Sequence, residues 1–223
     1  MAPMPAIRSF DSADPLGHLA IDDPVRALAA RGTVRRYRKG TLLIEEGDRG
    51  NTLYIILEGR LRAYCSSDNG REITLGVYGP GEYLGEMSLD GGVRSASVET
   101  LEASACAVVT RETIRDFIHD CPDFAFDLLT KVIRRARAAT LSAKNLALND
   151  VYGRLKLLLE SLGQVRDDGS RVIDERLTQR DLASRLGCSR EMVSRVMKDL
   201  EGGGYVRFDD RRIVVERALP VRW

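Results

Sequence analysis

Apolar and polar residues alternate in short runs between residues 33 and 110, and turns containing glycine separate the runs. Residues 53–57 and 73–77 each place an apolar side chain at every second position, which is the period of a strand with one buried face. Asn69-Gly70 lies between two such runs and is a strong hairpin signal. Short strands with regular turns predict a small barrel or jelly roll rather than a flat sheet.

Beyond residue 110 the apolar period becomes that of helices. We expect a short helix over 111–118, and one long helix over 123–148, where the sequence has neither Gly nor Pro. Apolar positions of the long helix step by three and four, as in a coiled-coil seam: Phe126, Leu129, Ile133, Ala136, Thr140, Ala143 and Ala147. This seam either packs on the strands or meets the same seam of a second copy.

Residues 178–200 predict two short helices around Gly187. Thr178 with Asp181 forms a capping-box pattern for the first helix, and Ser189 is the expected N-cap of the second. The second helix has an apolar side, formed by Met192, Val193, Val196, Met197 and Leu200. Its other side is polar, formed by Arg190, Glu191, Ser194, Arg195 and Lys198. Such a helix is either an ordinary amphipathic helix with a solvated face or the second helix of a helix-turn-helix.

The flanking segments favour a DNA-binding domain. Asn149-Asp150 can cap a preceding helix over 151–162, and a polar loop is expected over 166–175. Three glycines at 202–204 lead into two short strand-like runs, which would form the wing of a winged helix. Arg211 and Arg212 in this wing are candidates for contact with DNA phosphates. On the second helix, Arg can bind guanine bidentately and Glu can accept from cytosine N4.

A second candidate site lies in residues 81–99. Gly85-Glu86 and Arg94-Ser95 are separated by a short loop. Backbone N–H groups at glycines, an Arg and a Ser hydroxyl together suit an anionic phosphate, and Glu86 could accept from a sugar hydroxyl. The plainer alternative is a polar hairpin in which Glu86 and Arg94 form a solvated ion pair.

Charge and cysteine content narrow the function classes. The net charge is +1, but residues 151–223 carry 15 Lys and Arg against 12 Asp and Glu, a small local excess that can serve DNA binding. The four cysteines and two histidines form no ligand cluster, so we expect no metal and no iron–sulfur centre. Cys188 is expected to be a packing residue rather than a redox switch. With no apolar run of 18 residues and no signal pattern, we expect a cytoplasmic protein without a membrane span.

The run GCSREMVSRVMKDLE followed by GGGYVRF closely resembles the helix-turn-helix of the bacterial cyclic-AMP receptor and FNR family of transcription regulators. The resemblance implies that Arg190, Glu191 and Arg195 read base edges, that Ser194 also does so as in the FNR branch, and that Ser189 and Gln179 contact phosphate. It also implies double-stranded DNA with GTGA-like half-sites, a homodimer, and RNA polymerase as a partner. Because such proteins usually bind DNA as two-fold pairs, we favour the second copy as the partner of the seam.

Residues 40–110 are similar to the cyclic-nucleotide-binding domains of that family. The resemblance implies that Gly85 and Glu86 lie at the ligand, Glu86 on the ribose 2′-hydroxyl, and that Arg94 and Ser95 bind the cyclic phosphate. Ala63, Leu75, Arg135 and Thr140 match further ligand-binding positions, with the ligand expected between the strands and the long helix. Ala139 replaces one of two adjacent hydroxyl residues. Cyclic AMP is the first choice of effector, and cyclic GMP, cyclic di-GMP or no ligand stay open.

We therefore expect an α+β protein with four parts: a loose arm (1–22), a cyclic-nucleotide-binding β-roll or jelly roll (23–120), a long dimerisation helix and hinge (121–149), and a winged helix-turn-helix domain (150–223). The function expected is a ligand-gated transcription regulator. The alternative from another class is a nucleotide-binding regulatory subunit of an enzyme. No nucleophile, base and orienting residue occur together in a catalytic pattern, so the chain itself is not expected to be an enzyme.

Overall fold

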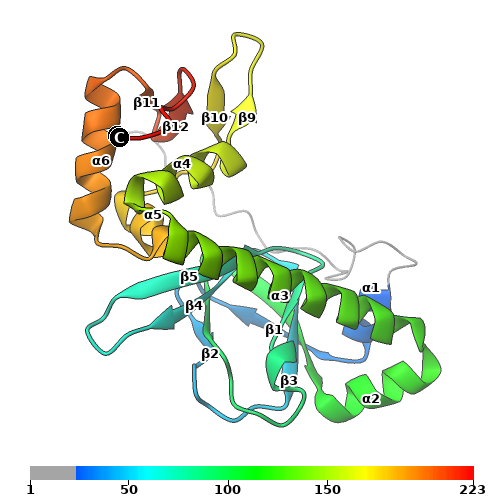
Figure 1. Ribbon diagram of the computed structural model, residues 1–223. Coiled ribbons are helices and arrows are strands. Elements are labelled where there is room, and N and C mark those ends of the chain that lie inside the picture. Colours follow the sequence, from blue (N-terminus) through cyan, green and yellow to red (C-terminus); the bar gives the residue numbers. More distant parts are fainter. Residues whose placement is uncertain (1–23) are drawn as a thin grey trace, which may run out of the picture. The chain divides into compact units, whose positions relative to one another are not determined.

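The computed structural model describes residues 24–223, and the predicted loose arm lies outside them (Figure 1). The chain divides into two compact units. The first comprises the described residues up to 62 together with 77–126, and the second comprises 63–76 together with 127–223.

The first unit is built around a four-stranded antiparallel sheet in the order β1-β8-β3-β6. Its central strand β3 buries Leu53, Ile55, Ile56 and Leu57 completely, so both of its faces are covered. The strands are β1 (Thr33–Tyr37), β3 (Thr52–Glu58), β6 (Tyr83–Leu84) and β8 (Ser104–Thr110).

A second four-stranded sheet has the order β2-β7-β4-β5. The predicted hairpin at Asn69-Gly70 is confirmed: Gly70 has a φ of 74°, and the Ser67 N–H donates to the Arg71 carbonyl at 2.9 Å. The two sheets agree with the predicted jelly-roll class. These strands are β2 (Leu42–Ile44), β4 (Leu61–Ser66), β5 (Glu72–Tyr78) and β7 (Ser97–Thr100).

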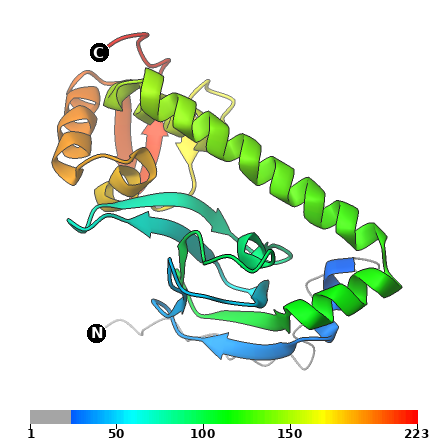
Figure 2. The same cartoon turned by 60° about the horizontal axis from the view of Figure 1, so that its bottom comes forward.

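Helices α1 (Pro24–Ala30) and α2 (Arg111–Asp120) both contact β8. Helix α3 (Asp123–Leu148) runs without a break, as the absence of Gly and Pro predicted (Figure 2). Three large seam residues are exposed in the single chain: Phe126 by 72%, Leu129 by 53% and Ile133 by 41%. These three side chains form an exposed apolar stripe on α3.

The second unit contains a compact winged helix-turn-helix (Figure 1). Its helices are α4 (Val151–Leu162), α5 (Gln179–Leu186) and α6 (Arg190–Gly202). Its sheet has the order β11-β12-β10-β9, with β9 (Gln164–Val165), β10 (Arg171–Ile173), β11 (Val206–Asp209) and β12 (Arg212–Val215). The shared core includes Leu155, Leu159, Leu182, Val193, Leu200 and Ile213.

The polar loop predicted over 166–175 is partly wrong. Residues 171–173 form β10, which pairs with β9 and β12. Val172 and Ile173 are only 4% and 1% exposed. Burial of these two apolar side chains stabilises the strand, although its neighbours in the sequence are charged. A run this short has no period that distinguishes it from a loop.

Candidate functional sites

Local hydrogen bonds fix the direction of α5 and α6. The Thr178 hydroxyl accepts from the Asp181 N–H at 3.2 Å, and the Asp181 carboxylate accepts from the Thr178 N–H at 2.8 Å, which completes the predicted capping box. Gly187 ends α5 in the left-handed conformation with a φ of 63°. The Ser189 hydroxyl then caps α6 by accepting from the Met192 N–H at 3.2 Å. Both helix starts are therefore set by short-range polar contacts, as predicted.

Helix α6 buries one side and exposes the other. Val193 and Leu200 are fully buried, and Met197 is 1% exposed. Met192, which the spacing assigned to the apolar side, is 39% exposed, so that assignment is wrong. Met192 lies at the edge of the buried stripe, one position before Val193, and Val193 is the residue that packs in the core.

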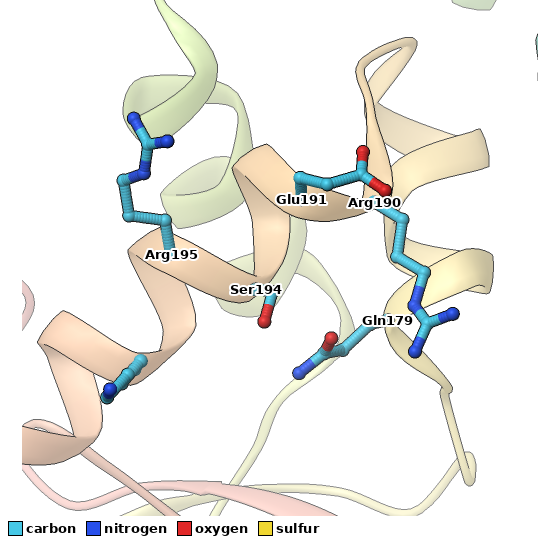
Figure 3. A pocket seen from close by; sticks show the side chains of 6 residues that line it. Gln179, Arg190, Glu191, Ser194 and Arg195 are labelled. Carbon is cyan, nitrogen blue, oxygen red and sulfur yellow. The ribbon is translucent and has the colours of Figure 1, made fainter.

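The exposed side of α6 and the first turn of α5 together line a surface depression of about 450 Å³. We call this surface the reading face; its residues are Gln179, Arg190, Glu191, Ser194, Arg195 and Lys198. Figure 3 shows these side chains projecting from successive turns of α6, with Gln179 added from α5. The DNA-contacting residues that the family resemblance implies are thus gathered on one surface, except Ser189, which serves as the N-cap. The wing candidates Arg211 and Arg212 do not line this surface.

The reading face contains one acidic residue, Glu191, among its basic residues. The pKa of Glu191 is lowered by a hydrogen bond from its own backbone N–H and by a second from the Ser189 hydroxyl, with Arg190 adding a smaller effect. An ionised Glu191 is a hydrogen-bond acceptor only, which suits the cytosine N4 amino group. The Ser189 hydroxyl therefore has two roles, one on the backbone of α6 and one on Glu191.

The two wing arginines that are candidates for phosphate contact, Arg211 and Arg212, have different surroundings. Arg212 Nη1 lies 3.5 Å from Asp174 Oδ1, which partly satisfies its charge within the protein. Asp210 and Arg211 form the turn with φ values of 43° and 65°, a region that favours glycine. Arg211 is exposed at this tip, so of the two wing arginines it is the better candidate for a phosphate contact.

The glycine-containing segment after β6 forms the second candidate site, in the first unit. Gly85 has a φ of 100° and precedes a single 3-10 turn, η1 (Glu86–Ser88). Glu86 is 8% exposed and Arg94 is 6% exposed. A solvated ion pair, the plainer alternative, does not fit two groups that are both this deeply buried. We call residues 85–95 the cassette.

Protein acceptors surround the Arg94 guanidinium. Nη1 donates to the Gly85 carbonyl at 3.0 Å and to the Ser88 hydroxyl at 2.8 Å. Nη2 donates to the carbonyl and the hydroxyl of Thr52, both at 3.0 Å. Burial lowers the pKa of Arg94 from its ordinary value, whereas Tyr54 and Glu86 act in the opposite direction. The cassette therefore contains a buried cation that mostly neutral acceptors hold in place.

Of the remaining predicted ligand contacts, one lies in the cassette and four lie in the second unit. Ser95 directly follows Arg94 and is exposed. Ala63, Leu75, Arg135 and Thr140 belong to the second unit. Ala63 is 6% exposed and Leu75 is 55% exposed, and the Thr140 hydroxyl donates to the Ala136 carbonyl at 3.0 Å.

Sequence reasoning missed three residues around Arg94: Gly50, Thr52 and Ser88. Thr52 is 42 positions away in the chain, and only the pairing of strands brings it close. Ser88 lies inside the cassette, close to Arg94 in the sequence. A serine in a polar loop is common, however, and does not by itself indicate a contact with a buried arginine. No group of three or more His, Cys, Asp or Glu in residues 24–223 is arranged to hold a metal ion.

Comparison with known families agrees with this arrangement of two sites. Residues 34–121 match the cyclic nucleotide-binding domain, and residues 153–218 match the Crp-like helix-turn-helix domain. Together the two matches cover more than half of the chain. The chain belongs to the CRP/FNR family of transcription regulators.

Individual CRP/FNR members give the same assignment. The chain is 34% identical over 190 residues to the cyclic AMP receptor protein of Thermus thermophilus, covering 82% of this chain and 84% of that protein. It is 30% identical over 183 residues to a CRP-like cAMP-activated global transcriptional regulator of Mycobacterium tuberculosis, covering 80% and 82%. The c-di-GMP responsive regulator CLP of Xanthomonas campestris has a similar structure, with a TM-score of 0.77, 26% identity, and 87% and 98% coverage.

These relatives are transcription regulators, so the chain is a DNA-binding regulator of the CRP/FNR family rather than an enzyme. Its first domain is of the cyclic nucleotide-binding class. Among the described residues, none of the helices is both long enough and apolar enough to cross a bilayer.

Proposed function

We propose that the protein is a homodimeric transcription regulator that binds palindromic DNA and whose DNA affinity is set by a cyclic nucleotide. The observation that carries the proposal is the reading face, where Arg190, Glu191 and Arg195 project from one side of α6. Cyclic AMP is the first candidate effector, since relatives at 30% and 34% identity are named for it. The proposal includes RNA polymerase as a partner and the cytoplasm as the location.

The effector contacts are Gly85, Glu86, Arg94 and Ser95 of the cassette, with Ala63, Leu75, Arg135 and Thr140 as further contacts. An effector changes DNA binding only if it binds the DNA-competent conformation more tightly than the other conformation. The two reading helices of the dimer would then meet half-sites about 34 Å apart, one turn of DNA. Arg190, Glu191, Ser194 and Arg195 would contact base edges, and Ser189 and Gln179 would contact phosphates.

A combined titration tests this function. Isothermal calorimetry would measure binding of cyclic AMP, cyclic GMP and cyclic di-GMP. Fluorescence anisotropy would measure binding to a duplex with two inverted GTGA half-sites, with and without each nucleotide. The control duplex has the same base composition and scrambled half-sites. Tighter and sequence-dependent binding with one nucleotide supports the proposal, whereas equal binding to both duplexes under all conditions contradicts it.

The dimer has its own test at the exposed seam of α3. Leu129→Glu places a charge at a position that is 53% exposed in the single chain, so the isolated fold tolerates the change. We expect this variant to be monomeric by light scattering and to lose affinity for the palindrome. Val165→Glu, at a 65% exposed position outside α3, is the matched control. A wild-type protein that is monomeric at micromolar concentration would refute the homodimer.

Cyclic di-GMP is the second candidate effector. The structurally similar CLP protein is described as responsive to that nucleotide. In this chain Ala139 precedes Thr140, so the seam offers one hydroxyl where two adjacent ones would suit an adenine amino group. The calorimetric comparison of the three nucleotides distinguishes these candidates directly.

A further inference from the structure

The first residues of β5 lie against α5, and both segments belong to the second unit. The Thr74 and Ser184 hydroxyls are hydrogen-bonded, with 2.7 Å between their oxygen atoms. Arg180 Nη2 lies 3.9 Å from Glu72 Oε1. Arg180 and Ser184 are four positions apart in α5, so they lie on the same side of that helix. One side of α5 therefore contacts β5.

The turn between α5 and α6 is part of the same contact. A Cβ at Gly187 would lie 3.4 Å from Ile73 Cδ1 and 3.4 Å from Leu146 Cδ2. Side chains of β5 and α3 therefore lie directly beside the turn of the helix-turn-helix. Because apolar packing is non-directional, it brings these segments together without fixing their alignment, whereas a hydrogen bond between two particular side chains fixes it.

The hydroxyl pair of Thr74 and Ser184 makes the largest polar contribution to this contact. Ser184 is 6% exposed and Thr74 is half-buried, so water does not readily replace either partner. A buried polar group that loses its partner is unfavourable, and removing one hydroxyl therefore weakens the contact. The pair of Glu72 and Arg180 contributes less, because the Arg180 side chain is 80% exposed and ion pairs in solvent are weak.

The contact with β5 leaves the reading face accessible. Arg190 and Arg195 are exposed in this arrangement, and both line the reading face. Helix α5 contributes Gln179 to the same face. Helices α5 and α6 share a core that includes Leu182 and Val193, so a segment that holds α5 also holds α6. The arrangement in which β5 contacts α5 is therefore compatible with DNA binding.

We propose that β5 is a latch on α5, closed by the hydrogen bond between Thr74 and Ser184, and that the closed latch stabilises the DNA-competent conformation. This inference rests on the proposed function, in which Leu75, the neighbour of Thr74, contacts the effector. An effector that binds more tightly when the latch is closed raises the fraction of DNA-competent protein. Opening the latch must in turn weaken effector binding, because only the competent fraction binds tightly.

Fluorescence anisotropy of the full chain on the palindromic duplex tests the latch, without nucleotide and with saturating cyclic AMP, cyclic GMP or cyclic di-GMP. Thr74→Val replaces the hydroxyl by a methyl group of similar size, and Ser184→Ala removes the partner hydroxyl. We expect each to weaken DNA binding without nucleotide about three- to tenfold, the effect of losing one hydrogen bond. The nucleotide that activates the wild type should reverse most of this loss, whereas a damaged reading face would not recover.

Two further variants show whether the hydrogen bond itself is responsible. Thr74→Ser keeps the hydroxyl and should bind DNA within about twofold of wild type. The double variant of Thr74→Val and Ser184→Ala should lose no more affinity than either single variant, because both changes remove the same bond.

Ser170→Ala is the matched control for Ser184→Ala. Ser170 is 4% exposed in the same unit, and its hydroxyl donates to the Asp168 carboxylate at 2.7 Å rather than to β5. This variant should lose stability on heating yet keep its DNA affinity.

The wild type and the variants answer different questions. If Ser184→Ala weakens DNA binding no more than Ser170→Ala, if the double variant loses the sum of the single losses, or if the activating nucleotide restores neither variant, the latch is refuted. Selective and nucleotide-dependent binding by the wild type then leaves the proposed function standing. If the wild type binds both duplexes equally, or if no nucleotide changes its DNA affinity, the proposed function is refuted and the latch with it.

Discussion

Replacing Arg190 with alanine is expected to reduce DNA sequence discrimination while leaving the fold intact. Arg190 is exposed in the first turn of α6, outside the buried stripe that includes Val193 and Leu200. Surface substitutions away from core and caps change stability by about 0.5 kcal/mol or less, and alanine is a good helix former. A change in DNA binding would therefore report on the contact with DNA and not on unfolding.

The expected magnitude follows from the bonds that Arg190 can make. A bidentate contact between an arginine and a guanine contributes about 1–3 kcal/mol of discrimination against a wrong base. This corresponds to a loss of about 5- to 150-fold in the ratio of specific to scrambled affinity at each half-site. Arg195→Ala, one turn further along the reading face, should give a loss of the same order.

The assay is fluorescence anisotropy at one fixed salt concentration on the palindromic and the scrambled duplex. Arg166→Ala is the charge-matched control, because Arg166 is an exposed cation of the same domain in the loop after β9, away from the reading face. It should affect both duplexes alike and only slightly, through the general attraction to phosphate. Equal losses on both duplexes for Arg190→Ala would show that this side chain contacts backbone phosphate, and the assignment to base edges would then be wrong.

Three further predictions concern the cap, the wing and a buried thiol. Thr178→Ala removes the capping box of α5 and should lower the free energy of unfolding by about 1 kcal/mol, measured by urea denaturation. Arg211→Gly relieves a φ of 65° and should stabilise the fold by about 1 kcal/mol in the same assay, yet weaken binding to palindromic and scrambled duplexes equally. Burial raises the pKa of Cys106 to about 12, so its contribution to stability is complete below its ordinary pKa near 9 and is lost as the pH rises toward 12. Cys106→Ala should reduce the alkaline loss of stability seen in denaturation curves between these pH values.

The helices were predictable because their signals are local. The bounds of α3 and α4 follow from the distribution of Gly and Pro and from the cap at Asp150, whose side chain accepts from the Gly153 N–H at 2.7 Å. The turn at Gly187 likewise depends on one residue with a positive φ. Signals of this kind need no knowledge of distant residues, and the reading face follows from them since α6 has only one apolar side.

The surroundings of Arg94 could not be predicted in this way. The sequence marks Arg94 and Glu86 as chemically suited to a phosphate and a sugar, but their burial depends on how β3 and the cassette meet. Thr52 belongs to a strand that looks like any other alternating run, and nothing near it in sequence indicates a buried cation. Strand β10 was missed for a related reason, because only its pairing with β12 distinguishes it from a loop.

The charge distribution of the C-terminal region is consistent with the selective DNA binding proposed for this nearly neutral chain. Of the 15 Lys and Arg in residues 151–223, at least five lie in ion pairs with acidic residues of the same unit: Arg176, Arg180, Arg185, Arg207 and Arg212. Cations neutralised in this way contribute little to the general attraction that any duplex exerts. The cations of the reading face, by contrast, lie where base edges can be reached, with Glu191 among them. Since non-specific affinity grows with every available cation and discrimination grows only with those at base edges, this placement favours discrimination over strength of binding.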